Sequence, residues 1–160
     1  TLCDMNENML NQGRKKLINT GIIKGINYIR ANAEDLPFRD NSFNLIIIAF
    51  GLRNVTNKNA ALKSMYDKLK YGSQLIVLEF SKVKIPLLDK IYQKYSSKFI
   101  PKLGKVIAGD EKSYRYLVES IYMHPNQEKL SLMMKKAGFE NIKHYNLASG
   151  LVAVHQGYKI

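Results

Sequence analysis

Three polar residues that could do chemistry each follow a segment predicted to be a β-strand. Asp4 follows a short apolar start of the chain, Asn32 follows the stretch 26–31, and Arg53 closely follows the unbroken apolar run 45–50. The carboxyl ends of parallel strands meet at one edge of a sheet, and ligands of open sheets bind in the crevice outside that edge. Their shared position therefore predicts that these three side chains line one binding site.

The chemistry available at these positions is that of nucleotide recognition. A carboxylate in the position of Asp4 can accept hydrogen bonds from both hydroxyls of a ribose. The Asn32 amide and the backbone of Ala33 can contact the rim of a purine. Each residue also has a plain structural alternative, because Asp near a helix start is often a cap and Asn favours turns. Arg53 could equally pair with a neighbouring acid or cap a helix.

Alternating strands and helices are predicted to position these residues. Asn6 caps a helix that ends before Gly21, and Thr56 or Asn57 caps a second helix that ends at Gly72. Strands are predicted at 26–31, 43–50, 74–80, 141–147 and 151–159, and further helices at 113–122 and 127–137. The alternation favours a parallel sheet that ends in an antiparallel hairpin. The lack of polar alternation in 43–50 predicts a strand covered on both faces.

Composition predicts one globular α/β domain over residues 1–160. The chain is 46% apolar and 24% charged, and no apolar stretch approaches the roughly 20 residues of a membrane helix. The single cysteine, Cys3, excludes an internal disulfide, favours the cytoplasm, and is expected to be a buried apolar residue. The three histidines lie in separate segments, so no metal site is predicted.

A net charge of +12 favours an anionic partner, whether nucleic acid, a membrane surface or a charged substrate. An AT-biased genome would enrich lysine as well. Seven lysines and one acid lie between Lys82 and Lys105, where apolar residues recur at helical spacing. A helix of this kind can lie on an anionic membrane, or it can pack over the sheet with a solvated lysine face.

Several segments resemble the bacterial ubiquinone/menaquinone biosynthesis C-methyltransferases, and the resemblance runs the whole length of the chain. The most specific segments are FGLRNV at 50–55 and SYRYLVESI at 113–121. The others are DMNENML at 4–10, ANAEDLPFRDNSF at 31–43, VLEFSK at 77–82, KKAGFE at 135–140 and GLVAVHQGYKI at 150–160. The resemblance implies methyl transfer from S-adenosylmethionine to a ring carbon of a polyprenylated benzoquinol or of demethylmenaquinol. It also implies a Rossmann-like class I methyltransferase sheet, mostly parallel with an antiparallel C-terminal hairpin.

The resemblance assigns cofactor contacts to four residues. Asp4 would bind the cofactor ribose, while Asn32 and Ala33 would border the adenine. Ala49 stands where the family commonly has Ser, so only its backbone could contact the cofactor.

Four residues are implied on the substrate side, namely Arg53, Asn54, Tyr114 and Tyr116. Arg53 cannot plausibly act as the base, because a guanidinium in a protein does not give up its proton. It could stabilise a developing phenolate or orient a water, with Asp4 or another acid taking the proton. Ordinary core packing is the alternative for the two tyrosines.

The family's first strand and glycine-rich cofactor loop have no counterpart in the chain, since they would precede Thr1. Their place lies between the strand ending at Asp4 and the strand 43–50, so we expect a gap in the sheet's centre or a rearranged strand order. The 160 residues alone are expected to bind S-adenosylmethionine poorly and not to catalyse.

The partners implied by the resemblance are a polyprenyl quinol, the anionic inner membrane as a peripheral surface, and a homodimer or a quinone-biosynthesis complex. The basic stretch could then wall the prenyl channel. Two other classes stay open. One is a basic RNA-binding methyltransferase-like module, for which the net charge is the only support and no RNA-reading motif is present. The other is a noncatalytic remnant that serves as a partner-binding subunit.

Overall fold

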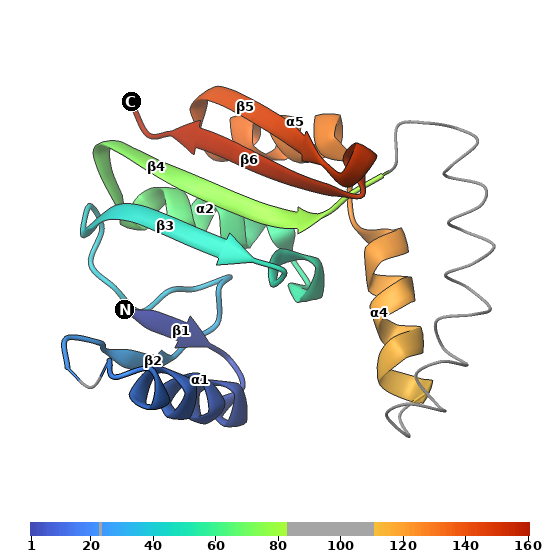
Figure 1. Cartoon of the computed structure of the whole chain (residues 1–160). Coiled ribbons are helices and arrows are strands. Elements are labelled where there is room, and N and C mark those ends of the chain that lie inside the picture. The colour runs from blue at the N-terminus through green and yellow to red at the C-terminus, as the bar shows by residue number, and fades with distance from the viewer. Residues whose placement is uncertain (23, 83–110) are drawn as a thin grey trace.

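The computed structural model describes residues 1–22, 24–82 and 111–160, which form two separate β-sheets with helices (Figure 1). The smaller sheet is the parallel pair β1 (Leu2–Asp4) and β2 (Tyr28–Arg30), flanked by helix α1 (Glu7–Asn19). The larger sheet has the order β3-β4-β6-β5, with β3 (Phe43–Ala49), β4 (Leu69–Phe80), β5 (Glu140–Leu147) and β6 (Val152–Tyr158). The other elements are α2 (Lys58–Lys68), α4 (Glu111–Met123), α5 (Gln127–Ala137) and the short 3-10 turns η1 (Leu52–Asn54) and η2 (Ala148–Gly150).

The strand directions confirm the predicted fold class. Strand β3 runs parallel to β4, whereas β6 runs antiparallel to both β4 and β5. The last two strands therefore form the expected antiparallel hairpin at the end of a mostly parallel α/β arrangement.

The sheet is interrupted where the resemblance places another strand. Among the described residues, β1 pairs only with β2 and β3 pairs only with β4, and in Figure 1 β1 and β3 run in the same direction. Every residue of β1 is exposed, and this includes Cys3, so the expectation that this cysteine is buried is wrong. Helix α1 flanks only one face of this two-stranded sheet and the outer side of β1 is open, so Cys3 stays exposed.

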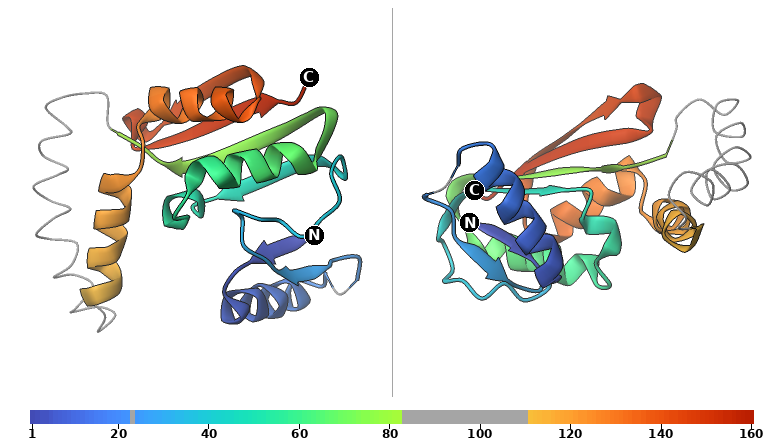
Figure 2. Two further views of the ribbon diagram at one scale, coloured as in Figure 1. Left: turned by 180° about the vertical axis from the view of Figure 1, so that it is seen from behind. Right: turned by 60° about the horizontal axis from the view of Figure 1, so that its bottom comes forward.

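Strand β3 also departs from its prediction, because only one of its faces is packed. Ile46 and Ile48 pack against the core, whereas Leu45 is 43% exposed and Ile47 is 60% exposed. Helices α2 and α5 lie together on one side of the larger sheet, as Figure 2 shows. No described element covers the opposite face of β3, and this explains the exposed side chains.

Helix α2 ends earlier than predicted. Asn57 is its cap, accepting a hydrogen bond from the Ala60 N–H at 3.0 Å, but the helix stops at Lys68 and not at Gly72. Leu69 has extended backbone angles and pairs with Phe43, so it begins β4. Gly72, with φ of +77°, lies inside β4, where the pairing with β3 shifts register. This glycine thus marks a bulge in a strand rather than a helix end.

The hydrophobic core fills the space between helices α2 and α5 and one face of the larger sheet. Its fully buried members include Leu52 of η1, Leu62 of α2, Leu75 of β4 and Phe139 beside β5. Leu52 matters most for the site, because its burial fixes the turn that follows β3. The neighbouring Arg53 is therefore held in a defined place.

Candidate active site

The chain makes a sharp turn where β3 ends. The Phe50 N–H still donates to the Leu78 carbonyl at 2.8 Å, but Phe50 itself has a φ of +51°. A non-glycine residue in this left-handed region costs on the order of 1 kcal/mol and is often found at functional sites. The turn carries the chain into η1 and brings Arg53 over the carboxyl end of β4.

Arg53 is paired with Glu79, the penultimate residue of β4. Its Nη1 lies 3.0 Å from Oε1 and 3.4 Å from Oε2 of the carboxylate, and its backbone N–H donates to Oε2 at 3.1 Å. Both side chains are largely buried, with 12% of Arg53 and 1% of Glu79 exposed. The alternative that Arg53 pairs with a neighbouring acid is therefore met in the structure, at the strand end where a ligand site was predicted.

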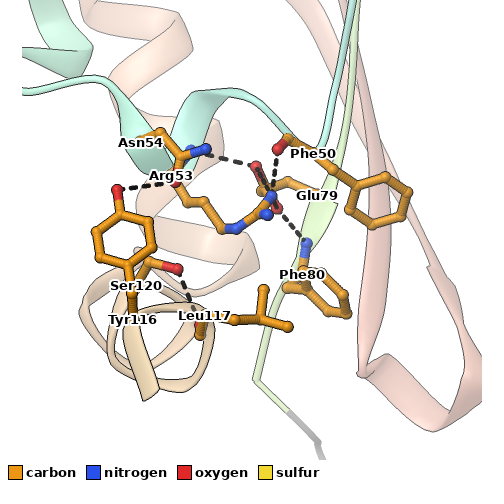
Figure 3. A network of polar contacts seen from close by, with 8 residues as sticks. All are labelled: Phe50, Arg53, Asn54, Glu79, Phe80, Tyr116, Leu117 and Ser120. Carbon is orange, nitrogen blue, oxygen red and sulfur yellow. Dashed lines mark hydrogen bonds and ion pairs between the residues drawn. The ribbon is translucent and has the colours of Figure 1, made fainter. Parts of the chain in front are cut away.

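Figure 3 shows what else surrounds the guanidinium. Its Nη1 also donates to the Phe50 carbonyl, and its carbon lies 5.4 Å from the centre of the Phe80 ring. Its Nε is buried and has no hydrogen-bond partner. A buried donor without an acceptor is costly, so this N–H points to a ligand or a water at the site.

The other predicted substrate residues lie beside η1. The Tyr116 hydroxyl of α4 donates to Oδ1 of Asn54 at 3.2 Å (Figure 3). Tyr116 is 57% exposed, so it is not part of the core. The side chain of Tyr114 lies outside the described part of the structure. Asn54 and Tyr116 thus form a polar rim next to Arg53.

Asp4 and Asn32 are neighbours at the matching edge of the smaller sheet. The Ala31 N–H donates to the Asp4 carbonyl at 3.1 Å, and this places Asn32 directly beyond the end of β1. Oδ1 of Asp4 accepts from the Asn6 N–H at 2.8 Å, and Oδ1 of Asn32 accepts from the Glu34 N–H at 3.0 Å. The cap of α1 is Asn6 and not Asp4, so only the turn alternative for Asn32 is met by these two hydrogen bonds. They leave Oδ2 of Asp4 and the amino group of Asn32 without a partner among the described residues.

The loop after β2 links the two sheets at this edge. The Glu34 carboxylate accepts from the Asn57 N–H at 3.0 Å, and Ser64 Oγ accepts from the Leu36 N–H at 3.0 Å. Ala33 packs against the core that α2 covers. The structure thus joins the Asn32 region to the start of α2, while no described contact links Asp4 with Arg53.

Glu79 and His124 are the site residues that sequence reasoning missed. Glu79 lies in VLEFSK, one of the segments that resemble the family, but the sequence analysis assigns this residue no role. An acid at the end of an otherwise apolar strand was the signal that could have identified it, since a buried carboxylate requires a partner. The same reasoning does not reach His124, whose place depends on how α4 packs.

His124 is a buried neutral base near the cations. It is 3% exposed, and neither ring nitrogen has a hydrogen-bond partner. Burial, followed by the charges of Lys58, His155, Arg53 and Lys82, lowers its pKa to about 3. Burial also lowers the pKa of Lys58, whose Nζ donates to the Val55 carbonyl at 2.9 Å. Three cations, Lys58, Arg53 and Lys82, therefore lie near His124, while the carboxylates of Glu79 and Glu34 act on Lys58.

The residues assigned to the cofactor fit a ribose and an adenine. Asp4 is exposed with Oδ2 available, as a ribose hydroxyl requires. Ala49 is exposed at the end of β3 and presents only a methyl group beside its backbone. The Asn32 amino group has no described partner and can donate to a ring nitrogen. The donor and acceptor set is thus suitable for S-adenosylmethionine.

Other features of the described residues lie away from this edge. A hollow of about 180 Å³ is lined by Arg14, Ile18, Ile22, Ile26 and Tyr28, beside the amino end of β2. None of the predicted site residues lines it. Within the described ranges, no three or more His, Cys, Asp or Glu side chains are grouped as a metal site would require, and no helix is long and apolar enough to cross a membrane.

Solved structures place the fold in one class. A methyltransferase of Thermotoga maritima that depends on S-adenosylmethionine (SAM) superposes with a TM-score of 0.69 at 22% identity, covering 99% of this chain and 72% of that one. The CurJ carbon methyltransferase superposes with a TM-score of 0.67 at 15% identity, covering 98% of this chain and 40% of that one. The fold is that of the class I SAM-dependent methyltransferases.

The family follows from the sequence comparisons. The profile of the ubiE/COQ5 methyltransferase family matches residues 1–159, and the chain belongs to this family. Proteins named ubiquinone/menaquinone biosynthesis C-methyltransferase UbiE are similar over 158 residues. The one from Klebsiella pneumoniae is 57% identical and the one from Escherichia coli 56%, each over 99% of this chain. The chain spans 63% of the length of each of these two relatives.

Proposed function

We propose that the protein to which this chain belongs methylates a ring carbon of a polyprenylated benzoquinol, of demethylmenaquinol, or of both. The observation that carries the proposal is the identity of 57% over 158 residues to a relative named as a ubiquinone/menaquinone biosynthesis C-methyltransferase. The class I fold and the position of Arg53 at a strand's carboxyl end support it.

On the cofactor side, we assign Asp4 to the ribose hydroxyls and Asn32 with Ala33 to the adenine. Ala49 would contact the cofactor through its backbone. When bound, S-adenosylmethionine supplies the electrophilic methyl group. The residues of this chain would hold the nucleoside part, so that the reacting groups meet in a fixed orientation, and orientation supplies a large part of such rate accelerations.

On the substrate side, we assign Arg53 to a quinol oxygen. Ionising a quinol hydroxyl makes the adjacent ring carbon more nucleophilic, and a fixed cation stabilises the negative charge as it develops. A guanidinium has N–H donors and no acceptor, so we do not assign the quinol proton to Arg53. Asn54 and Tyr116 would bind a further oxygen of the ring, and we keep Tyr114 as a candidate for the same role.

We infer that cofactor binding also requires the strand and glycine-rich loop that the family resemblance places before Thr1. The open sides of β1 and β3 support this inference, since a parallel strand placed there would join the two sheets. A loop after that strand would lie beside Asp4 and Ala49. Residues 1–160 alone are therefore expected to bind S-adenosylmethionine weakly and to show no turnover.

The test uses a chimera in which the N-terminal segment of the Escherichia coli relative precedes Thr1. We expect the chimera to transfer labelled methyl from S-adenosylmethionine to a ring carbon of a prenylated quinol, whereas residues 1–160 give no product. Mass spectrometry of the product would distinguish carbon from oxygen methylation. A folded chimera that binds the cofactor but methylates no quinol would contradict the proposed function.

We also propose peripheral contact with an anionic membrane, because the substrate is a lipid and the net charge is +12. The stretch between Lys82 and Lys105, which suggested this contact, lies almost wholly outside the described residues. Sedimentation with neutral and with anionic liposomes tests it. We expect binding to anionic liposomes that falls with added salt, and equal binding to both kinds would contradict the electrostatic contact.

A further inference from the structure

The carboxylate of Glu79 is fully engaged with one turn of the chain. Oε1 accepts from Nη1 of Arg53 at 3.0 Å and from the Phe80 N–H at 2.9 Å, while Oε2 accepts from the Arg53 backbone N–H at 3.1 Å. Both oxygens are therefore used by N–H groups of the protein. The carboxylate is thus occupied by contacts within the protein, and we assign Glu79 no direct contact with the substrate.

The same contacts decide which edge of the guanidinium is left for a ligand. Nη1 donates to the Phe50 carbonyl and to Glu79, so both of its hydrogens are used. No described residue accepts from Nη2, and Nε is buried without a partner. Nε and Nη2 form the side edge of a planar fork that can donate two parallel hydrogen bonds. This edge is the one that remains for an oxygen-bearing ligand.

A stabilising role alone does not account for this arrangement. A buried ion pair is often no more stable than apolar residues of the same volume. Here the pair is accompanied by a left-handed Phe50 and by an unpartnered Nε, two unfavourable features that a contribution to stability does not explain. Both features involve the Arg53 guanidinium, and we therefore infer that the turn serves to hold this guanidinium in one orientation.

We propose that Glu79 is a positioning residue, which fixes Nη1 of Arg53 so that the Nε and Nη2 edge faces the ionising oxygen of the quinol. The inference rests on the proposed function and adds to it a specific residue and a specific edge of the guanidinium. Glu79 touches neither substrate nor cofactor. It acts through Arg53 alone, and this is a property that kinetics can test.

The test is a double-mutant cycle in the chimera with Glu79→Gln and Arg53→Lys. Glu79→Gln keeps the shape and one acceptor oxygen but removes the charge, and we expect kcat to fall by about a hundredfold, as misorientation of a catalytic group can cause. The dissociation constant of S-adenosylmethionine should stay within about twofold, since Glu79 makes its hydrogen bonds to Arg53 and Phe80 and to none of the residues assigned to the cofactor. In the Arg53→Lys background, adding Glu79→Gln should cost less than about threefold, because the edge it positions is already lost.

Glu140→Gln is the matched control, since Glu140 is an exposed acid of the same sheet, and its kcat should not change. The kinetic values are taken per folded molecule, with folding checked by circular dichroism. A Glu79→Gln chimera with unchanged kcat, or two losses that multiply in the double variant, would overturn the inference. Neither outcome touches the proposed function, which fails only if the parent chimera methylates no quinol.

Discussion

At the scale of single residues, the charged side chains of Arg53 and Asp4 are held in place by contacts within the protein, without any ligand. Arg53 is held by Glu79, by the Phe50 carbonyl and by the Phe80 ring, so its position does not depend on a flexible side chain finding its target. The Asp4 side chain is held as well, because its Oδ1 accepts a hydrogen bond from the Asn6 N–H. In both residues the remaining hydrogen-bonding atoms are the ones that a ligand would meet.

Asp4→Asn tests the cofactor side at this scale. Asparagine keeps Oδ1 for the Asn6 N–H but loses the charge and the second acceptor, so folding should be unaffected. We expect the dissociation constant of S-adenosylmethionine in the chimera to rise about tenfold, which corresponds to about 1.4 kcal/mol. Calorimetric titration measures it. The control is Asp40→Asn, since Asp40 is an exposed acid that pairs with Lys68 at 2.7 Å. Equal affinities of the two variants for S-adenosylmethionine would exclude Asp4 from the ribose site.

At the scale of elements, two glycines with positive φ lie where the chain changes direction, one at the end of α5 and one inside β4. Gly138 ends α5 with a φ of +112°, and a Cβ built on it would lie 2.8 Å from Tyr66 Cζ. Gly72 has a φ of +77° with nothing within 4 Å of a built Cβ. The two glycines therefore share unusual backbone angles but differ in the space beside them.

This difference yields a paired stability prediction. Gly72→Ala adds backbone strain only, at a cost of about 1 kcal/mol in the free energy of unfolding. Gly138→Ala adds the same strain and displaces the Tyr66 ring, which packs edge-on against Phe139, so we expect a loss of about 3 kcal/mol. Urea denaturation of both variants measures the difference. Equal losses would show that the contact with Tyr66 is unimportant.

Element types were predictable from the sequence where periodicity was strong. The stripe of α2, the Asn6 and Asn57 caps and the C-terminal hairpin are all confirmed. The end of α2 was not predictable, because Gly72 is a turn signal in either a helix end or a strand bulge and only the pairing of Leu69 with Phe43 decides between them. Local sequence does not contain that long-range pairing.

At the scale of the whole molecule, the site depends on contacts between distant segments. The place of Asp4, Asn32 and Arg53 at or just after the end of a strand could be predicted from the order of the elements. The pairing of Arg53 with Glu79 could not, since it joins residues 26 positions apart through the register of β3 and β4. The open side of the sheet was expected only through the family resemblance, because no residue pattern marks a strand that is not there.

Two buried histidines make global stability depend on pH. Burial lowers the pKa of both His124 and His155. The charges near His124 are Lys58, Arg53, Lys82 and His155, while His155 faces His144, Glu128 and the Gln127 carbonyl. In the unfolded chain each histidine binds a proton below a pH of about 6.5, whereas the folded His124 stays neutral down to about 3. Stability is therefore full above about pH 6.5 and falls as the pH decreases.

For His124 alone we expect the free energy of unfolding to fall by about 1.4 kcal/mol per pH unit between pH 6 and 5, a range in which exposed carboxylates remain ionised. The lowered pKa of His155 should add to this fall. Urea denaturation at several pH values measures this slope. His124→Phe fills the same buried space without a titrating group and should reduce the slope by one proton. A slope that is unchanged in this variant would contradict the buried, neutral state of His124.

In the proposed function, the turn after β3 presents Arg53 to the substrate rather than to the cofactor. Turnover of the chimera with Arg53→Lys tests this claim most directly, because lysine keeps a cation beside Glu79 but cannot present the planar fork. We expect kcat with a prenylated quinol to fall by about a hundredfold or more, with the dissociation constant of S-adenosylmethionine within about twofold of the parent. An unchanged kcat, or a loss confined to cofactor affinity, would contradict the claim.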